Sequence, residues 1–257
     1  MASRLEKRLL NRVARACVDF DMLEDGDRVL VALSGGKDSF SLLALLERIR
    51  RRVPFELSLV AVNLDEGHPG YPQGEIGGWL VEHGYEHRLL QEDTYALVRR
   101  VVPEGDSYCS LCARVRRGIL YNAAVELGCT KVALGHHRED LIETLLLNLF
   151  YAGQLKSMAP RLRTDDGRNV VIRPLVYCDE DQLTAYAADQ RFPVVPRGLC
   201  GADVDQQRAR MKALIATLDA DNPKVKGNMM AALARIRPTH LLDRDLLAKL
   251  GPPADPG

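Results

Sequence analysis

The sequence predicts an α/β fold with a parallel sheet of five strands and helices on both faces, preceded by an N-terminal helix and followed by a helical C-terminal extension. Short apolar segments alternate with segments of helical periodicity between residues 28 and 175, which is typical of parallel strands joined by crossover helices. After about residue 178 the strand pattern ends, and helical segments are joined by prolines. The ligand site of such a sheet is expected at the carboxyl ends of its strands.

The individual elements follow from their periodicity. Apolar residues recur at helical spacing over residues 4–20, which predicts an amphipathic helix. Short apolar runs predict strands at residues 28–33, 57–64, 87–91, 131–134 and 170–175. Further helices are expected at residues 38–50, 75–83, 138–151, 180–190, 206–218 and 226–236. The chain is therefore divided into an N-terminal helix (1–24), a sheet domain (25–178), a helical extension (179–250) and a flexible tail (251–257).

The composition is that of a globular protein. Hydrophobic residues make up 46% of the 257 residues and charged residues 27%, which excludes a disordered chain. No segment approaches the roughly 20 apolar residues of a membrane span, and the charged N-terminus is unlike a signal peptide, so a cytoplasmic location is expected. The 35 basic residues balance the 35 acidic ones, so the protein does not coat nucleic acid through its net charge, although local basic surfaces remain open.

Residues 34–39, with the sequence SGGKDS, join the first predicted strand to the next helix. Two glycines let backbone N–H groups approach an anion, and the helix N-terminus adds a favourable dipole, so this turn predicts a phosphate site. Lys37 would supply positive charge, and Asp38 fits the site if Mg²⁺ bridges it to a nucleotide. A tight turn whose Ser34 or Asp38 caps the helix is the alternative. The expected phosphate-binding residues are Ser34, Gly35, Gly36, Lys37, Asp38 and Ser39.

A second polar segment, LGHHRED at residues 134–140, follows the fourth predicted strand and begins the next helix. It is therefore expected at the same sheet edge as residues 34–39. Its imidazoles and carboxylates would bind Mg²⁺ or position a polyphosphate, and we assign Gly135 and His136 to cofactor binding. Acids that only cap the helix are the alternative.

The loop at residues 34–39 resembles the PP-loop signature of enzymes that split ATP into AMP and pyrophosphate. The resemblance places the metal-associated acid of that superfamily at Asp140, so that Asp38 and Asp140 would hold Mg²⁺. It also implies catalytic roles for Lys37, Asp38 and Asp140. The tripeptide Arg173-Pro174-Leu175 resembles a short element of the same superfamily.

Three cysteines indicate a metal or redox site. Cys109 and Cys112 form a Cys-x-x-Cys pair, and Cys200 stands far downstream. A structural zinc usually takes four ligands, and a second pair is missing because position 197 is Arg. Three cysteines fit an iron–sulfur cluster with one iron open to another ligand. A redox-active thiol pair, a zinc site completed by a His, and unligated cysteines remain as alternatives.

Four segments make the resemblance more specific, because they are similar to segments of the tRNA 2-thiocytidine synthetases and follow in the same order. These segments are YCSLCARVRRGILY, ALGHHREDLIETLLLNLFYAG, GLCGADVDQQR and PTHLLD. The resemblance spans about residues 30 to 243. It implies a [4Fe–4S] cluster held by Cys109, Cys112 and Cys200, and it implies ATP, Mg²⁺ and a tRNA substrate. Many members carry a further Cys where this chain has Arg197, which weakens a persulfide relay at that position.

The implied reaction replaces the C2 oxygen of a cytidine in the tRNA anticodon loop, cytidine 32 by family resemblance, with sulfur. Transfer of AMP onto this oxygen makes it a leaving group, and Mg²⁺ and Lys37 would stabilise the released pyrophosphate. A sulfur nucleophile then attacks, with the cluster holding sulfide close to the carbon. Arg116 is assigned to catalysis within Arg114, Arg116 and Arg117, for which a solvated helix face is the alternative.

The partners follow from the same resemblance. A sulfur donor, the product of a cysteine desulfurase, and a homodimer are expected by analogy. Arg208, Arg210 and Lys212 in the C-terminal helices would contact the tRNA backbone.

Two other functions stay open. One is another PP-loop tRNA enzyme, either a 2-thiouridine synthase or a lysidine-type ligase; a ligase needs no cluster, and the flanking zinc-finger cysteines common in cluster-bearing thiouridine enzymes are missing from this sequence. The other is a non-catalytic nucleotide-binding or redox-sensing module.

Overall fold

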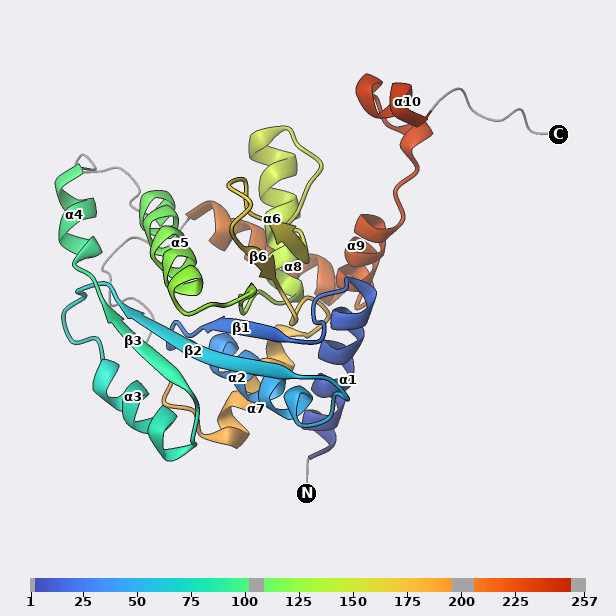
Figure 1. The fold of residues 1–257 in the computed structure, drawn as a ribbon. Helices are drawn as coiled ribbons and strands as arrows, with labels where there is room; N and C mark the ends of the chain where they lie inside the picture. The colour runs from blue at the N-terminus through green and yellow to red at the C-terminus, as the bar shows by residue number, and fades with distance from the viewer. Residues whose placement is uncertain (1–2, 102–108, 196–205, 251–257) are drawn as a thin grey trace.

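The computed structural model describes residues 3–101, 109–195 and 206–250, in which helices surround a six-stranded sheet (Figure 1). The strands are β1 (Asp27–Ala32), β2 (Leu57–Asp65), β3 (His87–Gln91), β4 (Lys131–Ala133), β5 (Arg161–Arg163) and β6 (Val170–Ile172). The α-helices are α1 (Arg4–Asp19), α2 (Lys37–Arg50), α3 (Gln73–Glu82), α4 (Thr94–Val101), α5 (Cys109–Glu126), α6 (Arg138–Leu147), α7 (Glu180–Gln190), α8 (Gln206–Asp221), α9 (Val225–Ala234) and α10 (Arg244–Leu250). A π-helix, η1 (Asn148–Ala152), continues α6, and a 3-10 helix, η2 (Pro238–His240), precedes α10.

The sheet has the strand order β3-β2-β1-β4-β6-β5. Five strands pair in parallel, and these are the five strands that the sequence predicts. The strand count of five is wrong, because β5 adds an antiparallel edge strand beside β6. All three residues of β5 are exposed, so this strand has no apolar run that could reveal it in the sequence.

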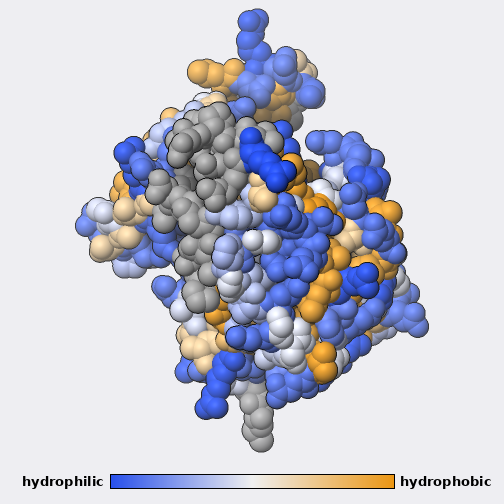
Figure 2. All heavy atoms as spheres, turned by 90° about the vertical axis from the view of Figure 1, so that its left-hand side faces the viewer, coloured by the Kyte–Doolittle hydropathy of each residue, from blue (hydrophilic) through white to orange (hydrophobic). Residues whose placement is uncertain are grey.

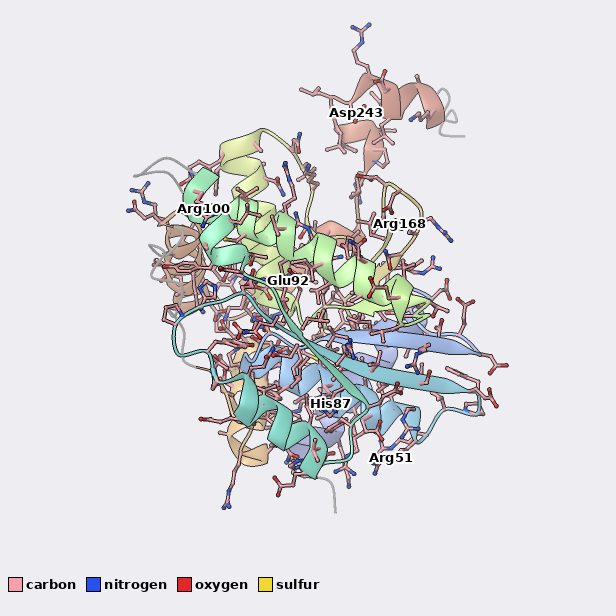
Figure 3. The ribbon with its side chains drawn as sticks, turned by 60° about the vertical axis from the view of Figure 1, so that its left-hand side comes forward. Arg51, His87, Glu92, Arg100, Arg168 and Asp243 are labelled. Carbon is pink, nitrogen blue, oxygen red and sulfur yellow. The ribbon has the colours of Figure 1, made fainter. Side chains whose placement is uncertain are left out.

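The parallel register brings the predicted motifs to one edge of the sheet. Ala32 at the end of β1 pairs with Val62 of β2, and its neighbour Val31 pairs with Ala133 at the end of β4. The strand order reverses at β1, with β2 and β3 on one side and β4 and β6 on the other. Figure 3 shows the direction: His87 and Glu92 mark the two ends of β3, and the Glu92 end lies toward α4. Open α/β sheets bind ligands at the carboxyl ends of strands at such a reversal.

Two apolar layers cover the sheet. On one face α1, α2, α3 and α7 form the main core, in which Leu9, Phe40 and Tyr186 are at most 1% exposed. On the other face α5 packs through Leu120 and Ala124 (Figure 1). Because α7 belongs to the main core, the segment after residue 178 packs directly on the sheet domain. The proposed domain boundaries stay a prediction.

Some helix limits differ from the sequence prediction. The predicted helix at 138–151 ends at Leu147 and continues as the π-helix η1, so its regular part is shorter than expected. Helices α4 and α10 were not predicted from the sequence. Ser3 accepts a hydrogen bond from Glu6 N at 3.1 Å and begins α1. The predicted flexible tail, residues 251–257, lies outside the described residues.

The periphery of the molecule is uneven. α10 projects away from the body (Figure 1). On the face that carries α3 and α4, hydrophobic residues form separate strips within a mostly hydrophilic surface (Figure 2). No helix within residues 3–101, 109–195 and 206–250 is long and apolar enough to cross a membrane.

Candidate active site

The glycine loop after β1 folds back on its own polar groups. Gly35 has a φ of +79°, a conformation that favours glycine, and Gly36 is the N-cap of α2. The carbonyl of Gly36 accepts hydrogen bonds from Ser39 N at 3.1 Å and Ser39 Oγ at 2.8 Å. Ser34 Oγ lies 3.3 Å from Ser39 Oγ. The loop is therefore a compact turn at a helix N-terminus, where an anion is favoured.

The segment after α7 lies over this loop. Val195 N donates to the carbonyl of Gly35 at 2.9 Å. A Cβ added to Gly35 would come within 2.5 Å of Val195 Cγ2, so position 35 has no room for a side chain. Glycine is thus required here for both its backbone angle and its size.

The second loop touches the first through Gly135. A Cβ at position 135 would lie 3.2 Å from three backbone atoms, namely Asp38 C, Asp38 O and Ser39 N. The two polar segments that the sequence analysis singled out are therefore in van der Waals contact at the carboxyl ends of β1 and β4. This contact confirms that they share one edge of the sheet.

His137 lies between the carboxylates of the two loops. Its Nε2 is 3.5 Å from Asp140 Oδ2 and 4.0 Å from Asp38 Oδ2, and its Nδ1 is 3.4 Å from Glu139 Oε2. Burial lowers the pKa of His137, but the neighbouring carboxylates outweigh burial and the net pKa is raised. Asp140 Oδ2 also accepts a hydrogen bond from His137 N at 3.0 Å, which fixes the first turn of α6. Two carboxylates thus converge on one imidazole ring.

Lys37 lies within a network of acids from two helices. Its Nζ donates to Asp38 Oδ1 at 2.7 Å and lies 3.6 Å from Glu180 Oε1 on α7. Glu180 also accepts from Lys212 Nζ at 2.8 Å. Burial raises the pKa of Glu180, but Lys212 and Lys37 outweigh burial and the net pKa is lowered. The network holds the Lys37 ammonium beside the glycine loop.

Arg173 orients His136. Arg173 Nε donates to His136 Nδ1 at 3.1 Å, so the proton of the neutral ring is on Nε2. Burial, and next the charge of Arg173, lower the pKa of His136 to about 4. The Arg-Pro-Leu element after β6 thereby supports the second loop, and His136 is a neutral hydrogen-bond donor at physiological pH.

Arg116 has a partner that the sequence analysis missed. Glu66, which follows β2 and is 7% exposed, accepts from Arg116 Nε at 3.0 Å and also from Arg116 Nη2. Thr94 Oγ1 donates to Glu66 Oε1 at 3.4 Å, and His68 Nε2 lies 3.9 Å from Glu66 Oε2. An acid placed directly after a buried strand was the available signal for Glu66. Glu180, which no motif marks, was missed as well.

Comparison with known proteins identifies the family. A protein named tRNA-cytidine(32) 2-sulfurtransferase from Anaeromyxobacter sp. (strain Fw109-5) is 57% identical over 244 residues, covering 95% of this chain and 80% of the relative. The chain belongs to the tRNA-cytidine(32) 2-sulfurtransferase family. The relative from Sorangium cellulosum (strain So ce56), which has the same name, is 53% identical over 247 residues, covering 96% of this chain and 87% of the relative. The family resemblance drawn from the sequence is confirmed.

Two further comparisons support the fold of this 2-sulfurtransferase family member. A PP-loop domain model matches residues 96–195, which begin after the glycine loop. The U34-tRNA thiolase NcsA from Methanococcus maripaludis, solved with its [4Fe-4S] cluster, superposes with a TM-score of 0.74 at 23% identity, covering 91% of this chain and 81% of that one. The superposition shows a common fold and confirms the predicted α/β class.

The cysteines that the family resemblance assigns to a cluster are only partly described. Cys109 is the first residue of α5, and Cys112 lies one turn later with a partly buried side chain. Cys200 lies outside the described residues. Within the described part of the chain, no group of three His, Cys, Asp or Glu side chains could hold a metal ion. The cluster of this family member stays a prediction.

Two basic residues of the C-terminal helices contact the carboxylates of the site. Arg208 Nε donates to Glu143 Oε2 at 2.9 Å, and Arg208 Nη2 lies 4.0 Å from Asp140 Oδ1. Lys212 contacts Glu180, as described above. In this sulfurtransferase family member α8 therefore adds positive charge to the polar site, and the expected contacts of these residues with tRNA stay a prediction.

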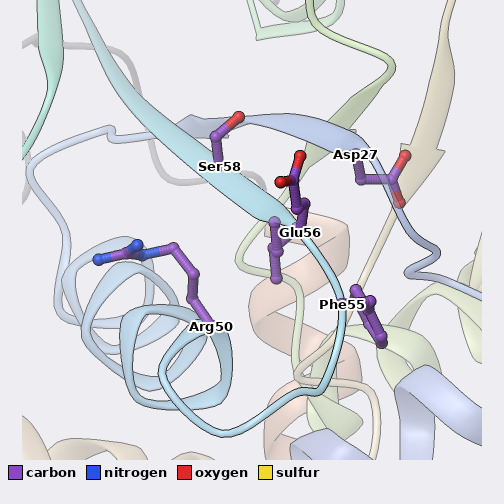
Figure 4. A pocket seen from close by; sticks show the side chains of 7 residues that line it. Asp27, Arg50, Phe55, Glu56 and Ser58 are labelled. Carbon is purple, nitrogen blue, oxygen red and sulfur yellow. The ribbon is translucent and has the colours of Figure 1, made fainter.

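An open hollow of about 430 Å³ lies at the amino ends of β1 and β2 (Figure 4). Its position is at the opposite edge of the sheet from the glycine loop, and none of the predicted site residues contributes to it. The candidate active site is therefore the contact between the two loops. The lining residues of the hollow are Gly26, Asp27, Arg50, Phe55, Glu56, Leu57 and Ser58.

Proposed function

We propose that this protein transfers AMP from ATP to the C2 oxygen of a tRNA cytidine, releases pyrophosphate, and replaces that oxygen with sulfur. The observation that carries the proposal is the contact at Gly135, which brings Lys37, Asp38 and Asp140 together at the carboxyl ends of β1 and β4. The names of the relatives supply the substrate, cytidine 32 of tRNA.

The loops supply what cleavage of ATP between its α and β phosphates requires. The glycine loop offers backbone N–H groups at the start of α2, and Lys37 offers a charge that offsets the developing pyrophosphate anion. Asp38 and Asp140 both face His137 Nε2, and two carboxylates this close favour a divalent cation. Mg²⁺ held by these two residues and by phosphate oxygens would withdraw charge from the leaving group.

Arg116 is proposed to stabilise the phosphate of the adenylated cytidine. A guanidinium has five N–H donors, of which Nε and one Nη2 hydrogen face Glu66. The side chain of Arg116 is 44% exposed, so the remaining donors can reach a substrate phosphate. Glu66 holds the guanidinium at the carboxyl end of β2, beside the proposed ATP site. A fixed charge of this kind needs no reorganisation when the reaction occurs.

Cys109, Cys112 and Cys200 are proposed to hold a [4Fe–4S] cluster, which would supply sulfide to the activated carbon. Cys109 and Cys112 lie three positions apart on α5, the helix that also carries Arg116. Two cluster ligands and the arginine proposed to stabilise the adenylated cytidine would therefore share one helix. The sulfur donor is proposed to be a cysteine desulfurase product. A homodimer in the cytoplasm is proposed by analogy with the family.

Pyrophosphate release tests the ATP step. We expect release to depend on tRNA, and we expect Lys37→Met and Asp140→Asn each to slow it by about 10²-fold or more. Lys37 offsets the charge of the leaving group, and Asp140 would hold the Mg²⁺ that also offsets it. Lys7→Met, which removes an exposed lysine of α1, is the matched control and should behave like the wild type. Equal pyrophosphate release with and without tRNA would refute the proposal.

Metal analysis tests the cluster. Anaerobically purified protein is expected to contain about four irons and four sulfides per chain, lost in Cys109→Ala, Cys112→Ala and Cys200→Ala. Cys129→Ala, which changes a buried cysteine outside the proposed set, should retain them. Stoichiometric zinc without sulfide would refute the cluster and leave the ATP step standing.

A further inference from the structure

An exposed apolar and basic surface lies next to the candidate site. It consists of the π-helix η1, the loop that follows it and strand β5. Phe150 is 57% exposed, Tyr151 48% and Leu155 58%. We call it the Phe150 surface, and its residues are Leu149, Phe150, Tyr151, Leu155, Lys156, Arg161 and Arg163.

Hydrogen bonds hold this surface in place. Asn148 Nδ2 donates to the carbonyls of Thr144 at 3.0 Å and Lys156 at 3.1 Å, which ties the loop to the end of α6. Ser157 Oγ donates to the carbonyl of Leu141 at 2.6 Å. A π-helix is rare and is often found at functional sites. Here it exposes two neighbouring aromatic rings on a fixed backbone.

The charge of the surface is one-sided. Between Thr144 and Thr164 the sequence has three basic residues and no acidic residue, although the whole chain has 35 of each. α5, on the other side of the β5–β6 hairpin, likewise has three arginines and no acid between residues 109 and 125. The hairpin is joined to α5 by Arg168, whose Nη1 donates to Asn122 Oδ1 at 3.3 Å (Figure 3). The Phe150 surface itself is therefore complementary to a polyanion, whereas the hairpin turn beyond it carries Asp165 and Asp166.

The Phe150 surface also connects directly to the site. Arg173 N donates to the carbonyl of Pro160 at 2.9 Å, next to Arg161, while Arg173 Nε holds His136 in the second loop. An RNA strand lying along this surface would therefore pass the mouth of the ATP site. Exposed aromatic rings bind unstacked bases, and arginine or lysine side chains bind the phosphates between them.

We propose that the Phe150 surface binds the single-stranded part of the RNA substrate, with Phe150 and Tyr151 stacking on bases that flank the modified nucleotide and Arg161 and Arg163 contacting phosphates. The inference rests on the proposed function for its partner, an RNA loop. It adds the residues that recognise this loop, none of which belongs to the two loops proposed to bind ATP.

The test measures binding of a fluorescently labelled anticodon stem-loop RNA to the full, cluster-loaded protein. Replacing Phe150 and Tyr151 together by Ala should weaken binding by about thirtyfold or more, because each stacked base contributes about fivefold or more. Arg161→Gln and Arg163→Gln should each lower the slope of log Kd against log salt by about one. Binding of a blunt RNA duplex of equal length should change little with the aromatic pair, because its bases are not unstacked.

One exposed residue far from the surface provides the control. Arg51→Gln changes an exposed arginine that follows α2, far from β5 (Figure 3). This variant should bind the stem-loop like the wild type. The affinity for ATP, measured without RNA, should be unchanged in every variant. This measurement separates loss of RNA contact from loss of the ATP site.

The outcomes distinguish the surface from the proposed function. If the variant that lacks both aromatic rings binds the stem-loop as tightly as the wild type and still thiolates it, the Phe150 surface does not bind the RNA. The proposed function would then stand. If the wild type binds the stem-loop through these residues but never thiolates it, the surface stands and the function fails. If the variant only changes the oligomeric mass in solution and not RNA binding, the surface contacts a second copy of the chain and the proposal is overturned.

Discussion

Gly135→Ala tests the contact between the two loops. The added Cβ would lie 3.2 Å from Asp38 C, Asp38 O and Ser39 N, all of which are backbone atoms that no side-chain rotation can move. The loops must therefore separate by roughly a few tenths of an ångström, and overpacking of this kind costs about 1–3 kcal/mol. The residues that must move are those that we expect to hold the polyphosphate.

The expected result has two parts. The free energy of unfolding should fall by about 1–3 kcal/mol in Gly135→Ala. Because misplacement of reacting groups is costly, kcat/KM for ATP in tRNA-dependent pyrophosphate release should fall by roughly ten- to a hundredfold. Urea denaturation and a coupled pyrophosphate assay measure these two quantities.

Gly78→Ala is the matched control. Gly78 is in α3, and a Cβ there meets no atom within 4 Å. The same substitution should stabilise this helix by up to about 1 kcal/mol and leave pyrophosphate release unchanged. If Gly135→Ala resembles Gly78→Ala in both stability and activity, the two loops are not in contact at Gly135.

Three further predictions concern single residues. Glu66→Gln should lower kcat more than it changes KM for ATP, because it loosens Arg116, and it should have little effect in an Arg116→Ala background. The pKa of His136, about 4, lies below the unfolded value, so the stability it contributes is present above about pH 6.5 and is lost as the pH falls toward 4, by about 3 kcal/mol. Asp27→Ala should destabilise the fold by about 3–5 kcal/mol, because it leaves Lys131 buried without its main partner.

Each of these predictions has a decisive comparison. If Glu66→Gln lowers kcat by the same factor in the wild-type and Arg116→Ala backgrounds, Glu66 does not act through Arg116. The acid-dependent loss of stability between about pH 6.5 and 4 should disappear in His136→Asn, and its persistence would assign it to another group. Asp27→Ala should retain normal activity per folded molecule, since Asp27 lies at the opposite edge of the sheet; reduced activity at full folding would contradict this.

The parts of the fold that could be predicted from the sequence are those with a regular pattern of apolar residues. The five parallel strands are buried apolar runs, and α1 has a regular apolar stripe beneath a serine cap. Strand β5 (Arg161–Arg163) has neither signal, because its pairing with β6 is made by the backbone and its side chains are exposed. The π-helix η1 was predicted as ordinary helix, because its sequence keeps helical spacing while its hydrogen bonds change.

The site could be predicted only where its residues belong to a motif. The two loops were found from residues 34–39 and 134–140, and the strand register explains why they meet. Glu66 and Glu180 are isolated acids, and only the fold brings them to Arg116 and Lys37. The ion pairs of α8 with the site could not be predicted either, since they join residues that are far apart in the chain.

Nucleoside analysis of the product tests the central claim most directly. Anaerobic, cluster-loaded protein is incubated with unmodified tRNA, ATP, Mg²⁺ and sulfide, and the digested tRNA is analysed by mass spectrometry beside a Lys37→Met reaction. We predict 2-thiocytidine at position 32, formed with AMP and pyrophosphate and missing with Lys37→Met. A 2-thiouridine or lysidine product, or AMP and pyrophosphate without any thiolated cytidine, would contradict it.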